Sequence, residues 1–251
     1  MTLTPSGDYS LPGPVQMWWG NLALRVAAFT PAGLRERFLS GRARYQILGD
    51  DVTGDHQGVS ERKWDAMQMP QEMKGQSVLD IGCSEGFFAL QCARRGAAPV
   101  VGVDSNLGRL LVGLFTADQE RLRVRFRMGV FPGPEFSGTF DYVICLSVLH
   151  HSLVTKDLWR VLTDPRCEQD RRTLRTQLGI LRSLTSNGGR SIIEMPYEYE
   201  WPEQERSVVD FQLFCQELLT AGFAKATCLG TWDYNPTHRA FKDRIIYVAQ
   251  A

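Results

Sequence analysis

Short apolar runs alternate with helical apolar patterns along the second part of the chain. Runs rich in Val, Ile and Leu predict strands at residues 77–82, 99–104, 124–129, 140–148, 191–195, 224–232 and 244–250. Helical periodicity indicates helices at residues 86–95, 107–122, 172–184 and 211–221, and Gly188-Gly189 predicts a turn. Near-continuous apolar strands that alternate with helices are typical of an α/β fold, in which helices cover both faces of a mostly parallel sheet. The last two strands have no helix between them, which predicts an antiparallel hairpin at the sheet edge.

The first seventy residues have a different pattern. Residues 1–15 are rich in Pro, Gly, Ser and Thr and predict an irregular N-terminal lead. Two helical patterns follow, interrupted near Thr30-Pro31. The first presents Trp18, Leu22 and Val26 on one face, and the second presents Leu34, Phe38 and Tyr45. Residues 16–70 are therefore predicted to form a small helical cap or lid, followed by a core domain at 71–251.

Composition excludes several classes of protein. The 251 residues are 43% hydrophobic and 22% charged with a net charge of zero, as in an ordinary globular protein without a general attraction to nucleic acid or membrane. The apolar patch at residues 17–29 is too short to span a bilayer, and no secretory signal pattern is present. The six cysteines include no C-x-x-C pair, which predicts a reducing setting and no metal site. We expect a soluble, cytoplasmic protein with no membrane partner.

The chemistry begins after the first strand, in the sequence DIGCSEG. The dinucleotide fingerprint G-x-G-x-x-G would need glycines at 82, 84 and 87, but the chain has Gly82, Ser84 and Phe87. Two acids, Asp80 and Glu85, would repel a pyrophosphate and would favour a cationic ligand. S-adenosylmethionine is such a ligand, since it carries a sulfonium and an ammonium and no phosphate. Asp104 ends the second strand, where an acid can accept both hydroxyls of a ribose.

The D-x-G-x-x-x-G loop and the strand ending in Asp104 resemble the first two motifs of class I S-adenosylmethionine-dependent methyltransferases. FDYVICLSVLHH resembles their fourth motif, and the resemblance covers about residues 60–250. It implies a Rossmann-like seven-stranded sheet and a catalytic, cofactor-binding domain at 71–251. The cofactor residues that it implies are Asp80, Gly82, Cys83, Ser84, Gly86, Asp104, Ser105, Asn106, Gly129, Val130 and Leu146. Many relatives have an Asp after the third strand to bind adenine. This chain has Met128-Gly129-Val130-Phe131 instead, so the backbone of Gly129 and Val130 and apolar stacking are expected to bind it. A dinucleotide enzyme with a degenerate loop is the alternative.

Three shorter stretches, SERKWDAM, GVF and VLHH, resemble the tRNA wobble-uridine carboxymethyltransferase family. That family uses a carboxylated cofactor, whose extra carboxylate is bound by a Lys, a Tyr and an Arg. The resemblance puts the Lys at Lys63 and the Arg at Arg244, but the Tyr position holds His150. The neutral chain also offers no obvious tRNA-binding face. We therefore expect S-adenosyl-L-methionine as the donor, with carboxy-S-adenosyl-L-methionine as the alternative.

His150 and His151 follow the fourth strand, where an acceptor would approach the methyl group. A histidine can remove the acceptor's proton, and His151 is the favoured candidate, while packing or capping of the strand end is the alternative role. Acceptor binding is predicted for aromatic residues of the cap and of the loop after the fifth strand, namely Trp18, Trp19, Tyr197, Tyr199 and Trp201.

These features predict methyl transfer to an oxygen or nitrogen of a small molecule. A tRNA wobble-uridine-type (carboxy)methyltransferase and a non-catalytic cofactor-binding subunit are the alternatives. The Arg-rich run at residues 164–177 predicts a solvated helix face or an oligomer contact, as in a homodimer, rather than an RNA-backbone clamp.

Overall fold

The computed structural model describes residues 11–40, 59–155, 158–197, 209–233 and 243–251. Seven strands form one sheet in the order β3-β2-β1-β4-β5-β7-β6. Their bounds are β1 Val78–Ile81, β2 Val100–Asp104, β3 Val124–Met128, β4 Phe140–Leu146, β5 Thr185–Tyr197, β6 Lys225–Asp233 and β7 Asp243–Gln250. The first five strands pair in parallel, and β7 runs antiparallel to both β5 and β6. The predicted Rossmann-like sheet with an antiparallel edge hairpin is confirmed.

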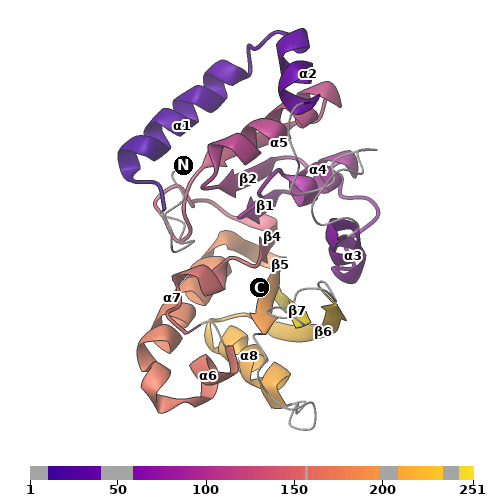
Figure 1. Cartoon of the computed structure of the whole chain (residues 1–251). Coiled ribbons are helices and arrows are strands. Elements are labelled where there is room, and N and C mark those ends of the chain that lie inside the picture. Colours follow the sequence, from indigo (N-terminus) through magenta and orange to yellow (C-terminus); the bar gives the residue numbers. More distant parts are fainter. Residues whose placement is uncertain (1–10, 41–58, 156–157, 198–208, 234–242) are drawn as a thin grey trace.

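Helices cover both faces of this sheet, as its apolar strands require (Figure 1). One face carries α1 Pro14–Ala27, α2 Ala32–Ser40, α3 Val59–Ala66, α4 Phe87–Arg94 and α5 Leu107–Gln119. The other carries α6 Leu158–Thr163, α7 Glu168–Leu184 and α8 Val209–Thr220. Alternate strand residues feed the two cores, so that Val78 faces α4 while its neighbour Leu79 faces α7. None of the described helices is long and apolar enough to span a membrane.

Two local predictions need correction. The Gly188-Gly189 turn is wrong, because both residues lie inside β5, which starts at Thr185 and is longer than the predicted 191–195. The pairing with β4 jumps there from Thr185 to Arg190, so residues 186–189 form an irregularity within the strand, with Gly188 at φ +79°. Helix α7 begins at Glu168 rather than at 172, and α6 was not predicted. The first turn of α7 is polar, so that apolar periodicity is weak there, and α6, with the sequence LWRVLT, is too short to show a helical period.

Helix α1 closes the open edge of the sheet at β3. The carboxamide of Asn21 donates to the carbonyl oxygen of Met128 at 3.0 Å and accepts from its N–H at 2.9 Å. This side chain satisfies two backbone groups that an edge strand would otherwise leave to solvent. Gly20 permits the close approach, because a Cβ there would lie 2.0 Å from Sδ of Met128. The predicted cap thus begins with a helix that packs against β3 and α5.

Candidate active site

The loop between β1 and α4, residues 82–86, turns through three residues with positive φ, at Gly82 (+69°), Ser84 (+54°) and Gly86 (+85°). A Cβ on Gly82 would lie 2.3 Å from Cγ2 of Val148, and a Cβ on Gly86 would lie 2.6 Å from the ring of Phe126. Both positions therefore require glycine for backbone conformation and for space. At Gly86 the crowding comes from the protein's own Phe126, whereas the sequence motif predicts close approach to a ligand.

The carboxylate of Asp104 joins this loop to the start of α5. One oxygen accepts from the backbone N–H of Ser84 at 2.8 Å, and the other accepts from the N–H of Asn106 at 2.8 Å. Asn106 is in turn the N-cap of α5, where its side chain accepts from the N–H of Arg109. Each carboxylate oxygen has two lone pairs, so both oxygens of Asp104 retain acceptor capacity for the hydroxyls of a ribose. Ser105, between Asp104 and Asn106 in the sequence, is half-buried.

Asp80 is buried beneath the loop and has a different role from Asp104. Its carboxylate accepts from the N–H of Ala89 in the first turn of α4 at 3.1 Å. Burial raises the pKa of Asp80 to about 7, against the lowering effect of the Ala89 hydrogen bond and with a further increase from the charge of Asp104. Burial also raises the pKa of the Cys83 thiol, so this side chain is a small apolar group rather than a thiolate. Asp80 can therefore exchange a proton near neutral pH.

The end of β3 is where the resemblance puts the adenine. The N–H of Gly129 donates to the carbonyl oxygen of Asp104 at 3.0 Å, and the N–H of Val130 donates to Oε1 of Glu135 at 2.5 Å. Both amides thus already have acceptors inside the protein. An adenine here would have to compete with Glu135 or use the carbonyl oxygens and the apolar surface of this segment. Glu135 was not among the predicted site residues.

A buried polar cluster lies at the ends of β4 and β5. The ammonium of Lys63 in α3 donates to Oε2 of Glu194 at 3.0 Å, and the hydroxyl of Ser147 donates to the same oxygen. Glu194 is fully buried in β5, and Ser147 follows Leu146, the buried last residue of β4. Neither Glu194 nor Ser147 was predicted from the sequence. A single acid inside the apolar strand SIIEM was the available signal, since buried carboxylates are rare unless they are paired.

His150 and His151 lie in a short 3-10 helix, η1 Leu149–Ser152, directly after β4. Their ring centroids are 4.1 Å apart with the planes tilted by 35°. His150 is buried and His151 is exposed, so of the two rings only that of His151 is open to an approaching acceptor. This difference in exposure supports the preference for His151.

The structure leaves several predicted residues apart from this arrangement. Trp18 and Trp19 lie on α1 with their rings in edge contact, and they are 61% and 59% exposed. Tyr199 and Trp201 lie outside the described residues. Tyr197 ends β5 and Arg244 lies in β7 in register with Pro196, but neither side chain is described.

The Arg-rich run at 164–177 spans the start of α7. Its arginines bind acids of the same fold: Arg166 pairs with Asp164, Arg171 and Arg172 pair with Glu168, and Arg175 pairs with Glu217. Their charge is thus largely balanced within the protein, as on a solvated helix face.

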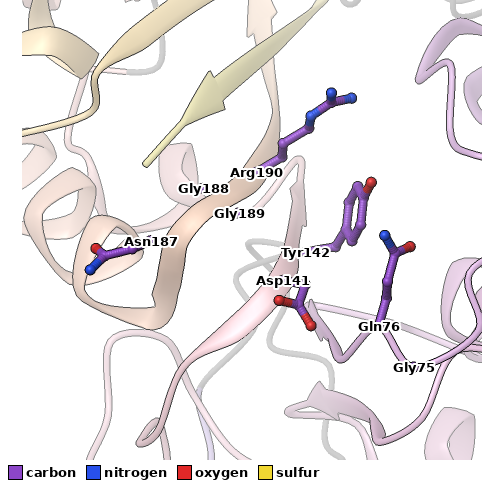
Figure 2. Close-up of a pocket in the computed structure, with 8 residues that line it drawn as sticks. All are labelled: Gly75, Gln76, Asp141, Tyr142, Asn187, Gly188, Gly189 and Arg190. Atoms are coloured by element: carbon purple, nitrogen blue, oxygen red, sulfur yellow. The ribbon is translucent and has the colours of Figure 1, made fainter.

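A polar pocket of about 390 Å³ lies at the amino ends of β1 and β4, away from the carboxyl ends where Asp104 and His151 lie (Figure 2). Its lining residues precede β1, begin β4 or lie in the irregular part of β5, and Asp141, Gln76 and Arg190 are among them. Asp141 accepts from the N–H and the hydroxyl of Ser77, which lowers the pKa of its carboxyl. Ligands of such sheets bind beyond the carboxyl ends of the strands, where Asp104 and His151 lie. The pocket in Figure 2 is therefore not the candidate active site.

A family model described as "Methyltransferase domain" matches residues 78–165. Among curated proteins, a tRNA U34 carboxymethyltransferase from Pseudomonas aeruginosa is 29% identical over 187 residues, which are 71% of this chain and 54% of that protein. A ubiquinone biosynthesis O-methyltransferase from Azorhizobium caulinodans is 39% identical over 80 residues, 32% of this chain and 31% of that protein. The chain thus spans about half or less of the length of these relatives.

Among solved structures, magnesium protoporphyrin IX methyltransferase from Synechocystis with bound cofactor superposes with a TM-score of 0.54 at 18% identity, covering 97% of this chain and all of that one. A phosphoethanolamine N-methyltransferase from Haemonchus contortus has a TM-score of 0.55 at 14% identity, covering 92% of this chain and 59% of that one. At these identities the likeness shows the fold.

Proposed function

We propose that the chain is a class I S-adenosylmethionine-dependent methyltransferase that transfers the methyl group to an oxygen or nitrogen of a small-molecule acceptor, in keeping with the methyltransferase-domain model that matches residues 78–165. The observation that carries this proposal is that the candidate cofactor residues and the candidate base follow neighbouring strands at the same end of the sheet. The 82–86 loop follows β1 and Asp104 ends β2. The exposed His151 follows β4, which is adjacent to β1.

The residues present fit the cofactor. The loop has no three-glycine turn for a pyrophosphate, and two buried acids, Asp80 and Glu85, surround it. A sulfonium and an ammonium would be stabilised there by the negative charge of an ionised Asp80. Asp104 would bind the ribose through the acceptor capacity that its two backbone contacts leave. When bound, the cofactor supplies a methyl group on a sulfonium, which is an excellent leaving group for an in-line displacement.

The protein's own task is then to align the acceptor and to remove its proton. Alignment can contribute up to about 7–11 kcal/mol in favourable cases. A general base typically adds about 10²–10⁴-fold, and His151 is the exposed candidate at the end of β4. We propose that His151 accepts the acceptor's proton and that the buried His150 holds its neighbour in position. Trp18, Trp19, Tyr197, Tyr199 and Trp201 remain candidates for acceptor binding.

A plain methyl donor is favoured over a carboxylated one by the Lys63–Glu194 pair. The ammonium of Lys63, which the resemblance assigns to the extra carboxylate, is already bound to the buried Glu194 at 3.0 Å. A cofactor carboxylate at this cluster would therefore have to compete with Glu194 for the ammonium of Lys63. The similarity to the tRNA U34 carboxymethyltransferase nevertheless makes tRNA modification the second candidate function.

One experiment separates these functions. The purified protein would be incubated with methyl-labelled S-adenosylmethionine and either a small-metabolite extract or total tRNA. We expect label in the small-molecule fraction, and Asp104→Ala should reduce it about 100-fold at cofactor concentrations below the dissociation constant. Label in tRNA would support the second candidate. Cofactor binding without label in either fraction would favour a non-catalytic subunit. Mass spectrometry of the nucleoside that co-purifies would identify the plain or the carboxylated donor directly.

A further inference from the structure

Helix α7 buries two polar side chains on the face that packs against the sheet. Asp170, Leu174 and Gln177 follow one another at spacings of four and three residues, so they share one face of the helix. All three are buried, with Asp170 5% and Gln177 1% exposed. The next inward positions hold Leu178 and Leu181. Asp and Gln are mostly exposed in folded proteins, so their burial on an otherwise apolar face indicates a specific role.

Gln177 supports the short helix that carries the two histidines. Its carboxamide nitrogen donates to Oγ of Ser152 at 2.7 Å, and that hydroxyl donates to the carbonyl oxygen of Leu149 at 2.9 Å. Leu149 and Ser152 are the first and last residues of η1, so these two bonds join both ends of the helix to α7. A 3-10 helix of four residues has few hydrogen bonds of its own and benefits from such outside support.

Asp170 holds the segment that follows η1. One carboxylate oxygen accepts from the N–H of Val154 at 2.9 Å, and the other accepts from the N–H of Thr155 at 2.8 Å. Hydrogen bonds from backbone N–H groups to a carboxylate are stronger than those between neutral groups. Helix α7 therefore fixes residues 149–155 at two places, one within η1 and one just beyond it.

The bond to Ser152 leaves the other end of the Gln177 carboxamide unsatisfied. A serine hydroxyl has one proton, and Ser152 uses it toward Leu149, so the nitrogen of Gln177 rather than its oxygen must face Ser152. The oxygen, Oε1, is buried and accepts no hydrogen bond from the residues that the structure describes. A buried acceptor without a donor lowers stability, and an apolar side chain of similar size avoids that loss. Stability alone therefore favours an apolar residue at position 177.

We propose that Gln177 and Asp170 are positioning residues for methyl transfer, which hold η1 so that the ring of His151 is aligned with the acceptor. This inference rests on the proposed role of His151 as the general base. A displacement of about 1 Å near the reacting groups can lower the rate about 100-fold. An apolar side chain at position 177 would pack against η1 without fixing its place. Turnover thus accounts for a polar side chain that stability does not favour.

A role of Gln177 in folding alone makes the opposite predictions for Gln177→Met. If the bond to Ser152 served only the fold, its loss would lower the denaturation midpoint and leave the rate per folded molecule unchanged. A positioning role predicts an unchanged or higher midpoint together with a lower rate, because the substitution also removes the unsatisfied oxygen. Chemical denaturation of each variant gives the midpoint.

Label transfer by the full chain measures the rate. Initial rates are compared with methyl-labelled S-adenosylmethionine as donor and a small-metabolite extract as the source of acceptor. Gln177→Met should lower the rate about 10- to 100-fold and leave the dissociation constant of the cofactor within about twofold. Gln169→Met is the matched control, because Gln169 is exposed on the same helix. This control should transfer label like wild type.

Further substitutions show whether the effect passes through η1. Ser152→Ala removes the same bond from the other side, so Gln177→Met/Ser152→Ala should be no slower than the slower single variant. Ser183→Ala is the control for the hydroxyl, because Ser183 donates to the carbonyl oxygen of Ile180 in the same way but is exposed. Added to His151→Ala, Gln177→Met should have no further effect. Any change of rate with pH that His151→Ala abolishes should persist in Gln177→Met.

Hydrogen exchange of the backbone amides reports on the segment without any acceptor. Asp170→Asn should speed exchange at Val154 and Thr155 at least about tenfold, because a neutral amide replaces the carboxylate that binds both N–H groups. Gln177→Met should speed exchange about fivefold at His151, whose N–H closes η1.

The proposal is overturned if exchange within residues 149–155 is unchanged in both variants, or if Gln177→Met transfers label as fast as Gln169→Met. It is also overturned if the lower rate of Gln177→Met only follows a loss of folded protein. If His151→Ala transfers label like wild type, the proposed base is wrong. If His151→Ala is slow and Gln177→Met is not, the base stands and the positioning role is wrong. No transfer by wild type would overturn the proposed function and this role together.

Discussion

The two halves of the sheet organise their polar groups over very different distances along the chain. In the half made of β1, β2 and β3, the contacts of Asp104 reach residues 2 and 20 positions away, and that of Asp80 reaches a residue 9 positions away. In the half made of β4 and β5, Glu194 binds Ser147 and Lys63, which lie 47 and 131 positions away. The candidate cofactor loop of the first half is thus held by local contacts, and the Glu194 cluster of the second half by tertiary contacts.

We call β1, β2 and β3 with the 82–86 loop the local half, and β4 and β5 with α3 and η1 the nonlocal half. This difference predicts that the two halves affect different properties of the protein. The local half presents a turn and a carboxylate fixed by neighbouring backbone amides, a geometry that suits one unchanging cofactor. The nonlocal half joins α3, β4, η1 and β5 through contacts between residues far apart in the sequence. Substitutions should therefore separate cofactor affinity in the first half from turnover and stability in the second.

The largest expected effect is on turnover, from His151→Ala. Loss of a general base should lower kcat about 10²–10⁴-fold. The dissociation constant of S-adenosylmethionine should stay within about twofold, because His151 is exposed and lies in the nonlocal half. Single-turnover label transfer and calorimetric cofactor titration would measure the two quantities. Unchanged kcat would exclude His151 as the base.

The buried pair of the nonlocal half should dominate stability. Lys63→Met removes the ammonium that the buried carboxylate of Glu194 binds at 3.0 Å, which should cost about 3–5 kcal/mol of unfolding free energy. Lys63→Met/Glu194→Gln removes both charges and should recover most of that loss. Chemical denaturation gives the values. If the two substitutions destabilise additively, the pair does not act as a unit.

In the local half, Asp104→Ala should weaken cofactor binding about 100-fold, since it removes two hydrogen bonds to a charged group and the acceptor for the ribose. Asp141→Ala is the matched control. It also removes a strand-end carboxylate that binds backbone, but at the amino end of β4, in the pocket of Figure 2. The control should lower stability and leave cofactor affinity unchanged. Equal loss of affinity in both variants would show that the site is misplaced.

The same contrast explains what could be predicted from the sequence. The positions of Asp80, Gly82 and Asp104 at the ends of β1 and β2 were predicted from short motifs, because local spacing determines them, and their roles toward a cofactor stay predictions. Glu194 and Ser147 were not predicted, since no local pattern relates them to Lys63. The exposure of one apolar face of α1 was also not predicted: the pattern showed Trp18, Leu22 and Val26 on one face, but apolar periodicity does not tell which face is packed. The close approach at Gly20 decides that, and it depends on β3 more than a hundred residues away.

Gly82 lies where the two halves meet, and Gly82→Ala should have a smaller effect. The added Cβ would lie 2.3 Å from Cγ2 of Val148, and the alanine would have to keep a φ near +69°. We expect a loss of about 1–3 kcal/mol in unfolding free energy. Gly138→Ala is the control for the backbone alone, because φ is +82° there and no atom lies within 4 Å of the new Cβ. Gly82→Ala/Val148→Ala should recover the part due to crowding, and no recovery would show that the backbone strain alone matters.

The smallest effect concerns pH and Asp80. Burial raises the pKa of this carboxyl from 3.8 to about 7 in the folded protein, so the folded state holds a proton that the unfolded state has released. The contribution of Asp80 to stability therefore falls as pH rises from about 4 to about 7 and stays low above that range. Asp80→Asn keeps an acceptor for the N–H of Ala89 and removes the titration, so its stability relative to wild type should increase across this window.

Cofactor binding gives the complementary measurement. A cationic ligand beside Asp80 favours the ionised carboxylate, so binding should release a proton and affinity should rise with pH below about 7, by less than tenfold per pH unit. Calorimetry in buffers with different ionisation enthalpies would detect the released proton, and Asp80→Asn should abolish the release. If wild type releases no proton, Asp80 does not face the positive charge of the cofactor. In that case its role in the local half is limited to holding the first turn of α4.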